Sequence, residues 1–434
     1  MTDTIFALSS GAPPAALGVI RISGPAAGKA LAALAGTLPT PRQASLRSLR
    51  VSRGTAQEAL LDQALVLWFP GPRTATGEDL AELHLHGGRA VVRVVEAALG
   101  QLDLGEDHPI RPAEAGEFTR RAFANGRIDL AEAEGLADLL SAETELQRRA
   151  AIAMAGGAFS QQVALWRDRV LSASAAVEAI LDFADEDDVA VLPELFHADL
   201  GALADDLTRW LERPRAEALR EGLRVVLAGP PNAGKSTLFN ALVEDEAAIT
   251  APLAGTTRDV LVRTVALGGV PFAFIDTAGL REGTADGIEA IGIDRARGEL
   301  DRADLVLWLG PEGEGPVGTW EIDAQIDRGD VARKRAPLHR VSAQTGEGLD
   351  VLRDALVAFG RDRLPRPGDV AINRRQADLL GRARVALARA QGQRDPLLLA
   401  EELRVTRVAF DTLIGRTTTE DMLDALFGRF CIGK

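Results

Sequence analysis

Residues 229–236 read Gly229-Pro230-Pro231-Asn232-Ala233-Gly234-Lys235-Ser236, which fits the phosphate-loop pattern of Gly, four residues, Gly-Lys and then Ser or Thr. The apolar, β-branched residues 223–228 before it predict a buried strand, and residues 237–242 after it open a helix. A strand, a glycine loop and a helix together let backbone N–H groups surround a polyphosphate at the helix N-terminus. The stretch therefore predicts a nucleotide-binding α/β module.

Each residue type in this loop has a chemical task. Gly229 and Gly234 let the backbone approach the phosphates closely, because glycine has no Cβ. Lys235 is expected to reach the β- and γ-phosphates, and Ser236 to hold Mg²⁺. The loop residues expected to bind the nucleotide are Asn232, Ala233, Gly234, Lys235, Ser236 and Thr237.

Length and composition set wider limits. The chain has 434 residues, which predicts two to four domains, with 46% hydrophobic and 26% charged residues, a globular balance. Its formal net charge of −14 argues against a protein that coats nucleic acid non-specifically. Cys431 is the single cysteine, which fits a reducing compartment. The sequence shows neither a signal-peptide pattern nor an apolar run long enough for a membrane span, so we expect a cytoplasmic protein without membrane contact.

Further segments follow the loop in the order typical of GTPases. Residues 255–259 lie about 20 residues after Ser236, where Thr257 can complete the Mg²⁺ shell. The predicted strand 272–275 delivers Asp276, which supports Mg²⁺ through water, and Gly279, whose N–H can meet the γ-phosphate. Residues 342–348 resemble a base-contacting segment of GTPases. Beyond the loop, the expected GTP contacts are Thr256, Thr257, Asp276, Thr277, Ala278, Gly279, Asp327, Ser342 and Ala343.

Two positions depart from the usual GTPase pattern. Leu280 follows Gly279, and an apolar side chain cannot polarise water as a glutamine would. The guanine-reading Asn-Lys-x-Asp is also missing. Residues 324–327, Ala-Gln-Ile-Asp, are the best candidate for its place, after a possible strand at 319–322. Asp327 can still pair with the N1 and N2 hydrogens of guanine, but we expect weaker base discrimination.

The pattern along the chain predicts a multidomain α/β protein. Residues 1–120 alternate strands (17–24, 64–69, 79–86) with a helix at 90–99, as an α+β domain does. Residues 121–220 and 361–434 carry helical periodicity, including Leu379, Val385, Leu397 and Leu403 on apolar faces. Residues 221–360 return to the α/β pattern. We therefore expect a discontinuous helical domain into which a Ras-like P-loop GTPase domain is inserted.

Over nearly its whole length the chain resembles the bacterial tRNA modification GTPases of the MnmE (TrmE) family. The resemblance is carried by residues 18–24, 76–79, 116–123, 231–236, 255–259, 276–282 and the terminal Phe-Cys-Ile-Gly-Lys at 430–434. It implies an N-terminal domain that binds folate and forms a homodimer. It also implies modification of C5 of the wobble uridine in tRNA (aminomethyl or carboxymethylaminomethyl type), together with the FAD-containing partner MnmG in a hetero-oligomer. The one-carbon unit would come from a 5-formyl or methylene tetrahydrofolate.

The resemblance also implies how GTP is hydrolysed. The G domains pair across the nucleotide, and K⁺ takes the place of an arginine finger, a role worth roughly 10³–10⁵ in rate for the arginine. The implied K⁺ site comprises Asn232 and the loop residues Ala251, Leu253 and Thr256, while Mg²⁺ is assigned to Ser236 and Thr257. Glu289 is the implied catalytic residue that positions water, ahead of Ile291-Gly292-Ile293.

The implied folate site consists of Arg21, Glu82 and Arg127, with Lys434 approaching from the C-terminal tail. This is chemically reasonable, because a carboxylate can bind the amidine-like edge of a pterin and cations can bind the glutamate tail of folate. Cys431 lies beside this implied pocket and is a candidate catalytic nucleophile, although a lone cysteine near a terminus is more often packed or incidental.

Other residues have readings that compete. His84 and His86 share a strand face, but no third metal ligand is evident, so we favour a structural role. The acidic run 185–188 is interpreted as a solvated turn rather than a cation site. Arginines that either meet tRNA phosphate or form local salt bridges are Arg120, Arg121, Arg127, Arg148 and Arg149.

Two other functions compete with tRNA modification. A ribosome-assembly GTPase switch would lack folate chemistry, but that class usually carries an RNA-binding module after its G domain, whereas residues 361–434 are helical. A folate-dependent transferase with a merely regulatory G domain is the third reading.

Overall fold

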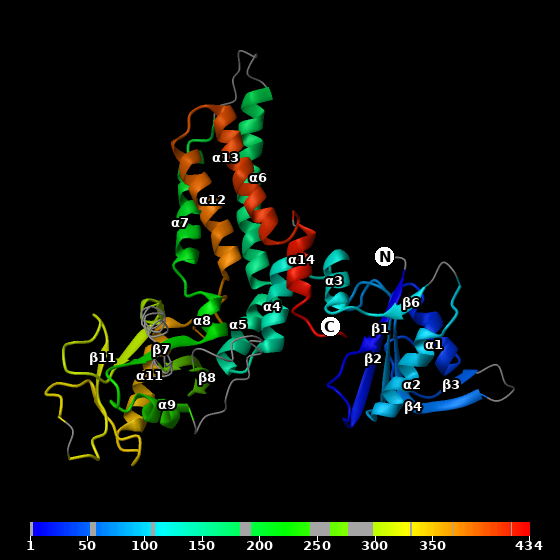
Figure 1. Cartoon of the computed structure of the whole chain (residues 1–434). Helices are drawn as coiled ribbons and strands as arrows, with labels where there is room; N and C mark the ends of the chain where they lie inside the picture. Colours follow the sequence, from blue (N-terminus) through cyan, green and yellow to red (C-terminus); the bar gives the residue numbers. More distant parts are fainter. Residues whose placement is uncertain are drawn as a thin grey trace, which may run out of the picture. The chain divides into compact units, whose positions relative to one another are not determined.

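The computed structural model describes residues 3–52, 58–105, 109–182, 192–243, 261–276, 298–329, 332–366, 368–417 and 419–434. The chain divides into two compact units. The first contains residues 1–137 and 411–434, and the second contains residues 138–410. Each is built around one six-stranded sheet (Figure 1).

The first unit is an α+β domain with strand order β3-β4-β5-β2-β1-β6. All neighbouring strands are antiparallel except β1 and β6. The strands are β1 Thr4–Leu8, β2 Leu17–Ser23, β3 Ser45–Ser52, β4 Glu58–Phe69, β5 Leu80–His86 and β6 Ile110–Pro112. The helices are α1 Ala27–Ala35, α2 Arg89–Gly100, α3 Glu117–Ala124 and α14 Glu420–Phe427. The strands and helix predicted from the pattern are confirmed.

One face of this sheet is the core of the unit. Ile20 and Ile22 of β2 pack there with Leu31 of α1 and Val95 of α2, all of them fully buried. Successive side chains on a strand point to opposite faces of the sheet. The residue between Ile20 and Ile22, and its partner on β5, therefore point to the other face. That other face therefore carries Arg21 and Glu82.

The second unit contains the sheet of the predicted nucleotide-binding module, with the strand order β12-β11-β10-β7-β9-β8. The strand pairs are parallel except β8 with β9 at one edge. The strands are β7 Leu223–Ala228, β8 Leu261–Leu267, β9 Val270–Asp276, β10 Leu305–Trp308, β11 Trp320–Asp323 and β12 His339–Arg340. Helices α9 Lys235–Val243 and α11 Leu349–Arg363 contribute Leu242 and Leu356 to its core.

Helices that come before this sheet in the sequence pack against a helix that comes after it. Trp166 lies 5.4 Å from Trp210 and 5.9 Å from Phe410 between ring centroids, so helices that precede and follow the sheet share one aromatic cluster. This confirms the discontinuous helical domain with an inserted G domain. The helices are α4 Leu130–Ser141, α5 Glu145–Ala155, α6 Ala158–Asp182, α7 Phe196–Leu211, α8 Ala216–Glu221, α12 Arg374–Gly392 and α13 Pro396–Leu413.

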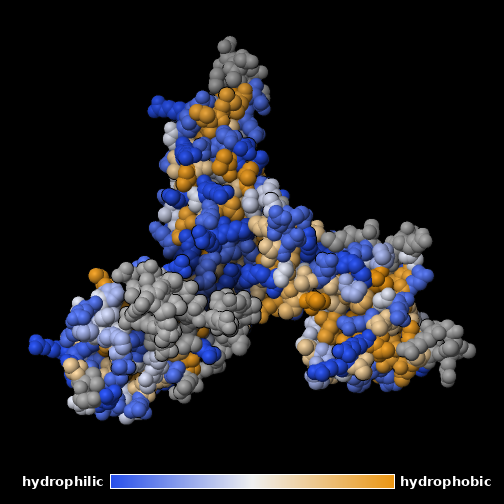
Figure 2. Space-filling view, in the orientation of Figure 1, coloured by the Kyte–Doolittle hydropathy of each residue, from blue (hydrophilic) through white to orange (hydrophobic). Residues whose placement is uncertain are grey.

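The surface of these helices carries hydrophobic side chains among hydrophilic ones (Figure 2). Of the residues predicted on apolar faces, Leu379 and Leu403 are buried, whereas Val385 and Leu397 are 41% and 68% exposed. Leu397 lies in the first turn of α13, where its backbone N–H donates to Asp395. Across the stretches that the structure describes, no helix is both long and apolar enough to span a bilayer.

Candidate functional site

The phosphate loop connects the end of β7 to the start of α9, as the pattern predicts. Gly229, Asn232 and Gly234 all have positive φ, at 151°, 62° and 89°. A Cβ on Gly229 would lie 2.9 Å from the backbone nitrogen of Gly310, so this position tolerates only glycine without a shift of the backbone. The loop is therefore a tight backbone cradle at a helix N-terminus, which suits an anionic phosphate group.

Lys235 places a positive charge inside this cradle. Its side chain is buried, and its Nζ donates hydrogen bonds to the carbonyl oxygens of Gly229 at 3.0 Å and Pro230 at 2.8 Å. These neutral carbonyls are weaker partners than phosphate oxygens for an ammonium group. The arrangement keeps the charge at the position where a polyphosphate would enter the loop.

Ser236 and Asp276 supply oxygen atoms beside the loop. The Ser236 hydroxyl donates a 2.6 Å hydrogen bond to Oδ2 of Asp276, the last residue of β9, which is 1% exposed. Hydroxyl and carboxylate oxygens are the ligands that Mg²⁺ prefers, usually alongside water and substrate phosphates. The donor pair therefore fits Mg²⁺, and the structure brings together two residues about 40 positions apart in the sequence.

The proposed base end of the site follows β11. A cavity of about 150 Å³ is lined by residues that include Thr237, Gln325, Asp327 and Ala343. The Ser342 hydroxyl donates a 2.6 Å hydrogen bond to Oδ1 of Asp327 and lowers the pKa of that carboxyl group. Asp327 is thus an anionic acceptor at the cavity, and strand β11 at Trp320–Asp323 places the Ala-Gln-Ile-Asp segment directly after a strand end.

Gln325 connects this cavity to the phosphate loop. Its Nε2 donates to the carbonyl oxygen of Asn232 at 3.2 Å, and its side chain lies over Gly234, where an added Cβ would come within 3.0 Å of it. Together with Ala324 and Arg328, Gln325 also lines a second cavity of about 580 Å³ between the loop and residues 309–312, so this segment borders both cavities. Ala233 lines only the second of them. The sequence indicates this segment but no role for Gln325, because a glutamine after a strand carries no signal of its own.

Part of the predicted nucleotide site lies outside the described residues. This applies to the K⁺ loop and to the segment after β9, including Leu280. The predicted site residues concerned are Ala251, Leu253, Thr256, Thr257, Thr277, Ala278, Gly279 and Glu289.

A polar cluster occupies the face of the N-terminal sheet opposite α1 and α2. Arg21 lies directly across the β2–β5 pair from Glu82, and its Nη2 donates to Oε1 of Glu82 at 2.9 Å. The other carboxylate oxygen meets Nε2 of His84 at 3.2 Å. Burial acts to raise the pKa of Glu82, but hydrogen bonds from His84 and Arg21 and their charges outweigh it, so the pKa falls below its usual value. Glu82 is therefore an ionised acceptor, half-buried between the Arg21 guanidinium and the His84 ring.

Apolar side chains border this cluster. Leu65 lies directly opposite His84 and is 46% exposed, and its own partner Leu46 is 65% exposed. The Arg21 guanidinium lies 5.9 Å from the ring centroid of Phe118 on α3. A flat ring with hydrogen-bond donors at one edge would find both an apolar support and an anionic acceptor here.

The other predicted folate residues lie in the same unit. The Arg127 side chain packs against Gly77, where an added Cβ would come within 3.2 Å of its Cγ. The backbone N–H of Lys434 donates to the carbonyl of Cys431 at 3.2 Å. Within the described part of the chain, no hydrogen bond or ion pair joins Arg127 or Lys434 to the Arg21–Glu82 pair. Cys431 is a free and exposed thiol.

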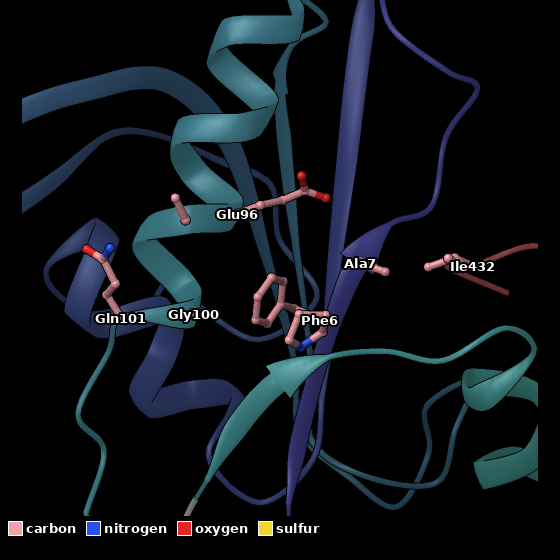
Figure 3. Close-up of a pocket in the computed structure, with 8 residues that line it drawn as sticks. Phe6, Ala7, Glu96, Gly100, Gln101 and Ile432 are labelled. Carbon is pink, nitrogen blue, oxygen red and sulfur yellow. The ribbon is translucent and has the colours of Figure 1, made fainter.

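A separate apolar cavity of about 470 Å³ opens beside the tail. Figure 3 shows Glu96 projecting from α2 toward β1, with the Phe6 ring below it and Ile432 beyond Ala7. Burial raises the pKa of Glu96, while a hydrogen bond with the backbone of Leu8 acts in the opposite direction. The amino-acid sequence gives no indication of this cavity, since its lining comes from distant segments.

The structure shows which partners the arginines of the basic cluster have. Arg120 pairs with Glu420 and Asp424, Arg121 is fully buried among Asp3, Glu78 and Glu117, and Arg148 and Arg149 both pair with Glu145. The local salt-bridge reading therefore holds for these four.

His84 and His86 have carboxylate partners rather than a metal cluster. His84 meets Glu82, and His86 meets Asp62 at 2.7 Å. Among the residues with described positions, no group of three or more potential metal ligands occurs. Residues 185–188 lie outside the described ranges.

Comparisons with known proteins agree with this architecture. The family described as "GTP-binding protein TrmE N-terminus" matches residues 4–127, and the "MnmE helical domain" matches residues 130–431. Proteins named tRNA modification GTPase MnmE are similar over the full length of both chains, at 63% identity in Erythrobacter litoralis and 61% in Novosphingobium aromaticivorans. A third, from Zymomonas mobilis, is 49% identical over 99% of this chain and all of its own.

Proposed function

The chain belongs to the MnmE family of tRNA modification GTPases, and from that premise we propose that it uses GTP hydrolysis to drive modification of C5 of the wobble uridine in tRNA. The observation that carries the GTPase part is the joint placement of Lys235 in the loop cradle and of Ser236 against Asp276. These groups would hold the phosphates and Mg²⁺ of GTP. Bound Mg²⁺ would neutralise charge on the β- and γ-phosphates.

Guanine would be read at the cavity between Asp327 and Ala343. The Asp327 carboxylate accepts hydrogen bonds, as a partner for the N1 and N2 hydrogens of guanine must. Adenine presents an acceptor at N1 and would face this carboxylate unfavourably. We therefore assign the nucleotide as GTP, in spite of the missing Asn-Lys.

Potassium would assist hydrolysis through paired G domains. The supporting residue in the described part is Asn232, whose exposed side chain stands on the loop at φ 62°. Ala251, Leu253 and Thr256 complete the proposed K⁺ site, and Thr257 the Mg²⁺ shell. Glu289 would position the attacking water, because Leu280 cannot. Thr277, Ala278 and Gly279 would follow the γ-phosphate.

The test is GTP turnover in KCl and in NaCl at matched ionic strength, with ATP as a competitor. The proposal expects strong stimulation by K⁺ that ATP does not suppress. Turnover that does not respond to K⁺ would contradict the Asn232 and loop assignment. In Glu289→Ala, hydrolysis should slow while nucleotide binding stays the same, and equal loss of both would contradict its role.

The N-terminal sheet would bind a tetrahydrofolate derivative, in the 5-formyl or methylene form. Glu82 would accept hydrogen bonds from the pterin edge, while Arg21, Arg127 and Lys434 would meet the anionic tail. Cys431 is the proposed nucleophile toward the one-carbon unit. Labelled formyl-tetrahydrofolate mixed with the full-length protein tests this site, and absence of binding would favour a GTPase switch without folate chemistry.

The proposed partners follow from the same function. The exposed apolar residues beside Glu82, including Leu46 and Leu65, support a homodimer through the N-terminal domain. MnmG, with FAD, would supply the redox chemistry, and tRNA would be the shared substrate in the cytoplasm. The domain limits proposed are 1–120, 121–220, 221–360 and 361–434. Light scattering of the protein alone and with MnmG tests both assemblies.

A further inference from the structure

The loop that would read the base lacks the two side chains that usually hold it. Ala324 and Gln325 stand where asparagine and lysine are typical, and Ala324 has no polar side chain. Gln325 also has a positive φ of 58°, a conformation that residues with a Cβ adopt rarely. Some other group must therefore stabilise the backbone around Asp327.

The Arg333 guanidinium provides these contacts. Its Nη1 donates to the carbonyl oxygen of Gln325 at 3.2 Å, and its Nη2 donates to those of Ile326 at 2.9 Å and Arg328 at 2.5 Å. One planar group with five N–H donors can serve several acceptors at once in a fixed geometry.

The same guanidinium is itself held in place. Its Nη1 lies 3.7 Å from Oδ1 of Asp323, which is 3% exposed, and Nε of Arg340 lies 3.8 Å from Oδ2 of the same carboxylate. This buried charge at the end of β11 favours a cation nearby. The backbone N–H of Arg328 adds a 3.0 Å hydrogen bond to the Gln325 carbonyl, which closes the turn.

Asp327 lies between two of the carbonyls that Arg333 binds. The carbonyl of Ile326 precedes Asp327 and that of Arg328 follows it, and one Nη2 atom contacts both. The orientation of the peptide units around Asp327 is thus fixed from one side, while Ser342 fixes the carboxylate from the other. The backbone that carries the acceptor cannot rotate without breaking these bonds.

We propose that Arg333 is a positioning residue that sets the selectivity of the nucleotide site for guanine, in place of the missing Asn-Lys pair. The proposal rests on the proposed GTP function. Among the residues that the structure describes, the Arg333 guanidinium donates hydrogen bonds to the backbone of the base loop and to none of the phosphate-loop residues. Its effect should therefore be larger on recognition of the base than on binding of the phosphates. If Arg333 had a merely structural role, its loss would weaken the binding of all nucleotides and of tripolyphosphate alike.

The experiment measures dissociation constants of GDP, IDP, ADP and inorganic tripolyphosphate for the full-length protein. IDP lacks the 2-amino group, so the ratio of IDP to GDP reports pairing with Asp327. We expect Arg333→Ala to weaken GDP by about tenfold or more, as loss of several charge-assisted hydrogen bonds implies, and to reduce the ratio toward one. Binding of tripolyphosphate should stay unchanged.

Two further variants sharpen the result. Arg335→Ala removes an exposed positive charge two residues away and should leave all four constants unchanged. Arg333→Lys keeps the charge but has one nitrogen, so the IDP to GDP ratio should still fall. It also keeps the test available if Arg333→Ala fails to fold. Adding Ala324→Asn and Gln325→Lys to Arg333→Ala should restore the ratio.

The outcomes separate this inference from the function on which it rests. If the unmodified protein binds GDP no more tightly than ADP, the assignment of GTP fails. If it prefers GDP but Arg333→Ala behaves like Arg335→Ala, the positioning role fails and the GTPase assignment stands. An equal loss for GDP and tripolyphosphate would also overturn the positioning role.

Discussion

The hydroxyl of Ser342 donates a 2.6 Å hydrogen bond to a carboxylate oxygen of Asp327, across 15 residues of sequence. The bond holds one carboxylate oxygen of Asp327 in place, and Ala343, next to Ser342, lines the same cavity as Asp327. An acceptor fixed in this way can read the edge of a base that presents two N–H groups. Replacement of one carboxylate oxygen of Asp327 by an amide nitrogen should therefore change which base the site prefers.

Asp327→Asn replaces the acceptor by an amide, which can donate to a carbonyl. Guanine has an amino group at C2, whereas xanthine has a carbonyl there. We expect GTP turnover to fall by about 10² or more and XTP to become the better substrate, since unpaired polar groups in a base site cost heavily. Turnover assays with both nucleotides check this. An unchanged preference would exclude Asp327 from base reading.

Asp276→Asn removes the negative charge of the side chain that accepts the hydrogen bond of Ser236. Because Mg²⁺ favours anionic oxygen near its ligands, the Mg²⁺ concentration for half-maximal GTP turnover should rise by about tenfold. The exposed Asp301→Asn, in the same unit, is the control and should leave that concentration unchanged. A Mg²⁺ titration of turnover distinguishes the two, and identical curves would contradict the assigned role of Asp276.

Glu82→Gln removes the negative charge that Arg21 and His84 surround. Binding of formyl-tetrahydrofolate should weaken by about tenfold or more, because charge-assisted hydrogen bonds are lost. Glu96→Gln, whose carboxyl group lines the separate cavity of α2, is the matched control and should bind normally. Since the pKa of Glu82 lies below its usual value, binding by the unmodified protein should persist as the pH falls to the ordinary range of glutamate. Equilibrium dialysis with labelled ligand measures both effects.

Glu117 links the buried Arg121 to Arg111. Burial acts to raise the pKa of Glu117, but hydrogen bonds from Arg111, the Glu114 amide and Arg121 hold it below its ordinary 4.5. A folded-state pKa below the unfolded one stabilises the fold above the ordinary value, and this stability is lost as the pH falls toward the folded-state pKa.

Glu117→Gln should therefore lower the free energy of unfolding at pH 7 by about 3 kcal/mol, since it leaves Arg121 under-paired in the interior. At a pH below the ordinary pKa of Glu117, the difference in the free energy of unfolding between the variant and the unmodified protein should become smaller. Urea denaturation at pH 7 and pH 4 measures it. Glu145→Gln, which breaks an exposed pair, should have no measurable effect, and a comparable loss there would refute the argument from burial.

Cys431→Ser tests the exposed thiol at the tail. The variant should retain GTP turnover, because Cys431 lies in the first unit and the phosphate loop in the second. It should lose modification of tRNA if the thiolate attacks the one-carbon unit. Mass spectrometry of the wobble nucleoside decides this, and full modification by Cys431→Ser would end the nucleophile proposal.

The sequence by itself determined the phosphate loop, the strands that flank it and the alternation of helical and α/β segments. These are local signals: glycine spacing, β-branched runs and helical periodicity act over a few residues. Strand β3 at Ser45–Ser52 carries little such signal, since leucine recurs every three residues among serine and arginine instead of alternating with period two. Val385 and Leu397 matched a periodic pattern but remained at the surface.

Only the tertiary structure decided which distant groups meet. Arg333 reaches the carbonyls around Asp327, Gln325 reaches the phosphate loop 93 residues away, and His84 joins Arg21 through the shared carboxylate of Glu82. No spacing rule predicts these contacts, because they depend on the order of strands in a sheet and on where each strand ends. Sequence patterns identify the chemistry that is available, whereas the packing of elements fixes which atoms lie within hydrogen-bond distance.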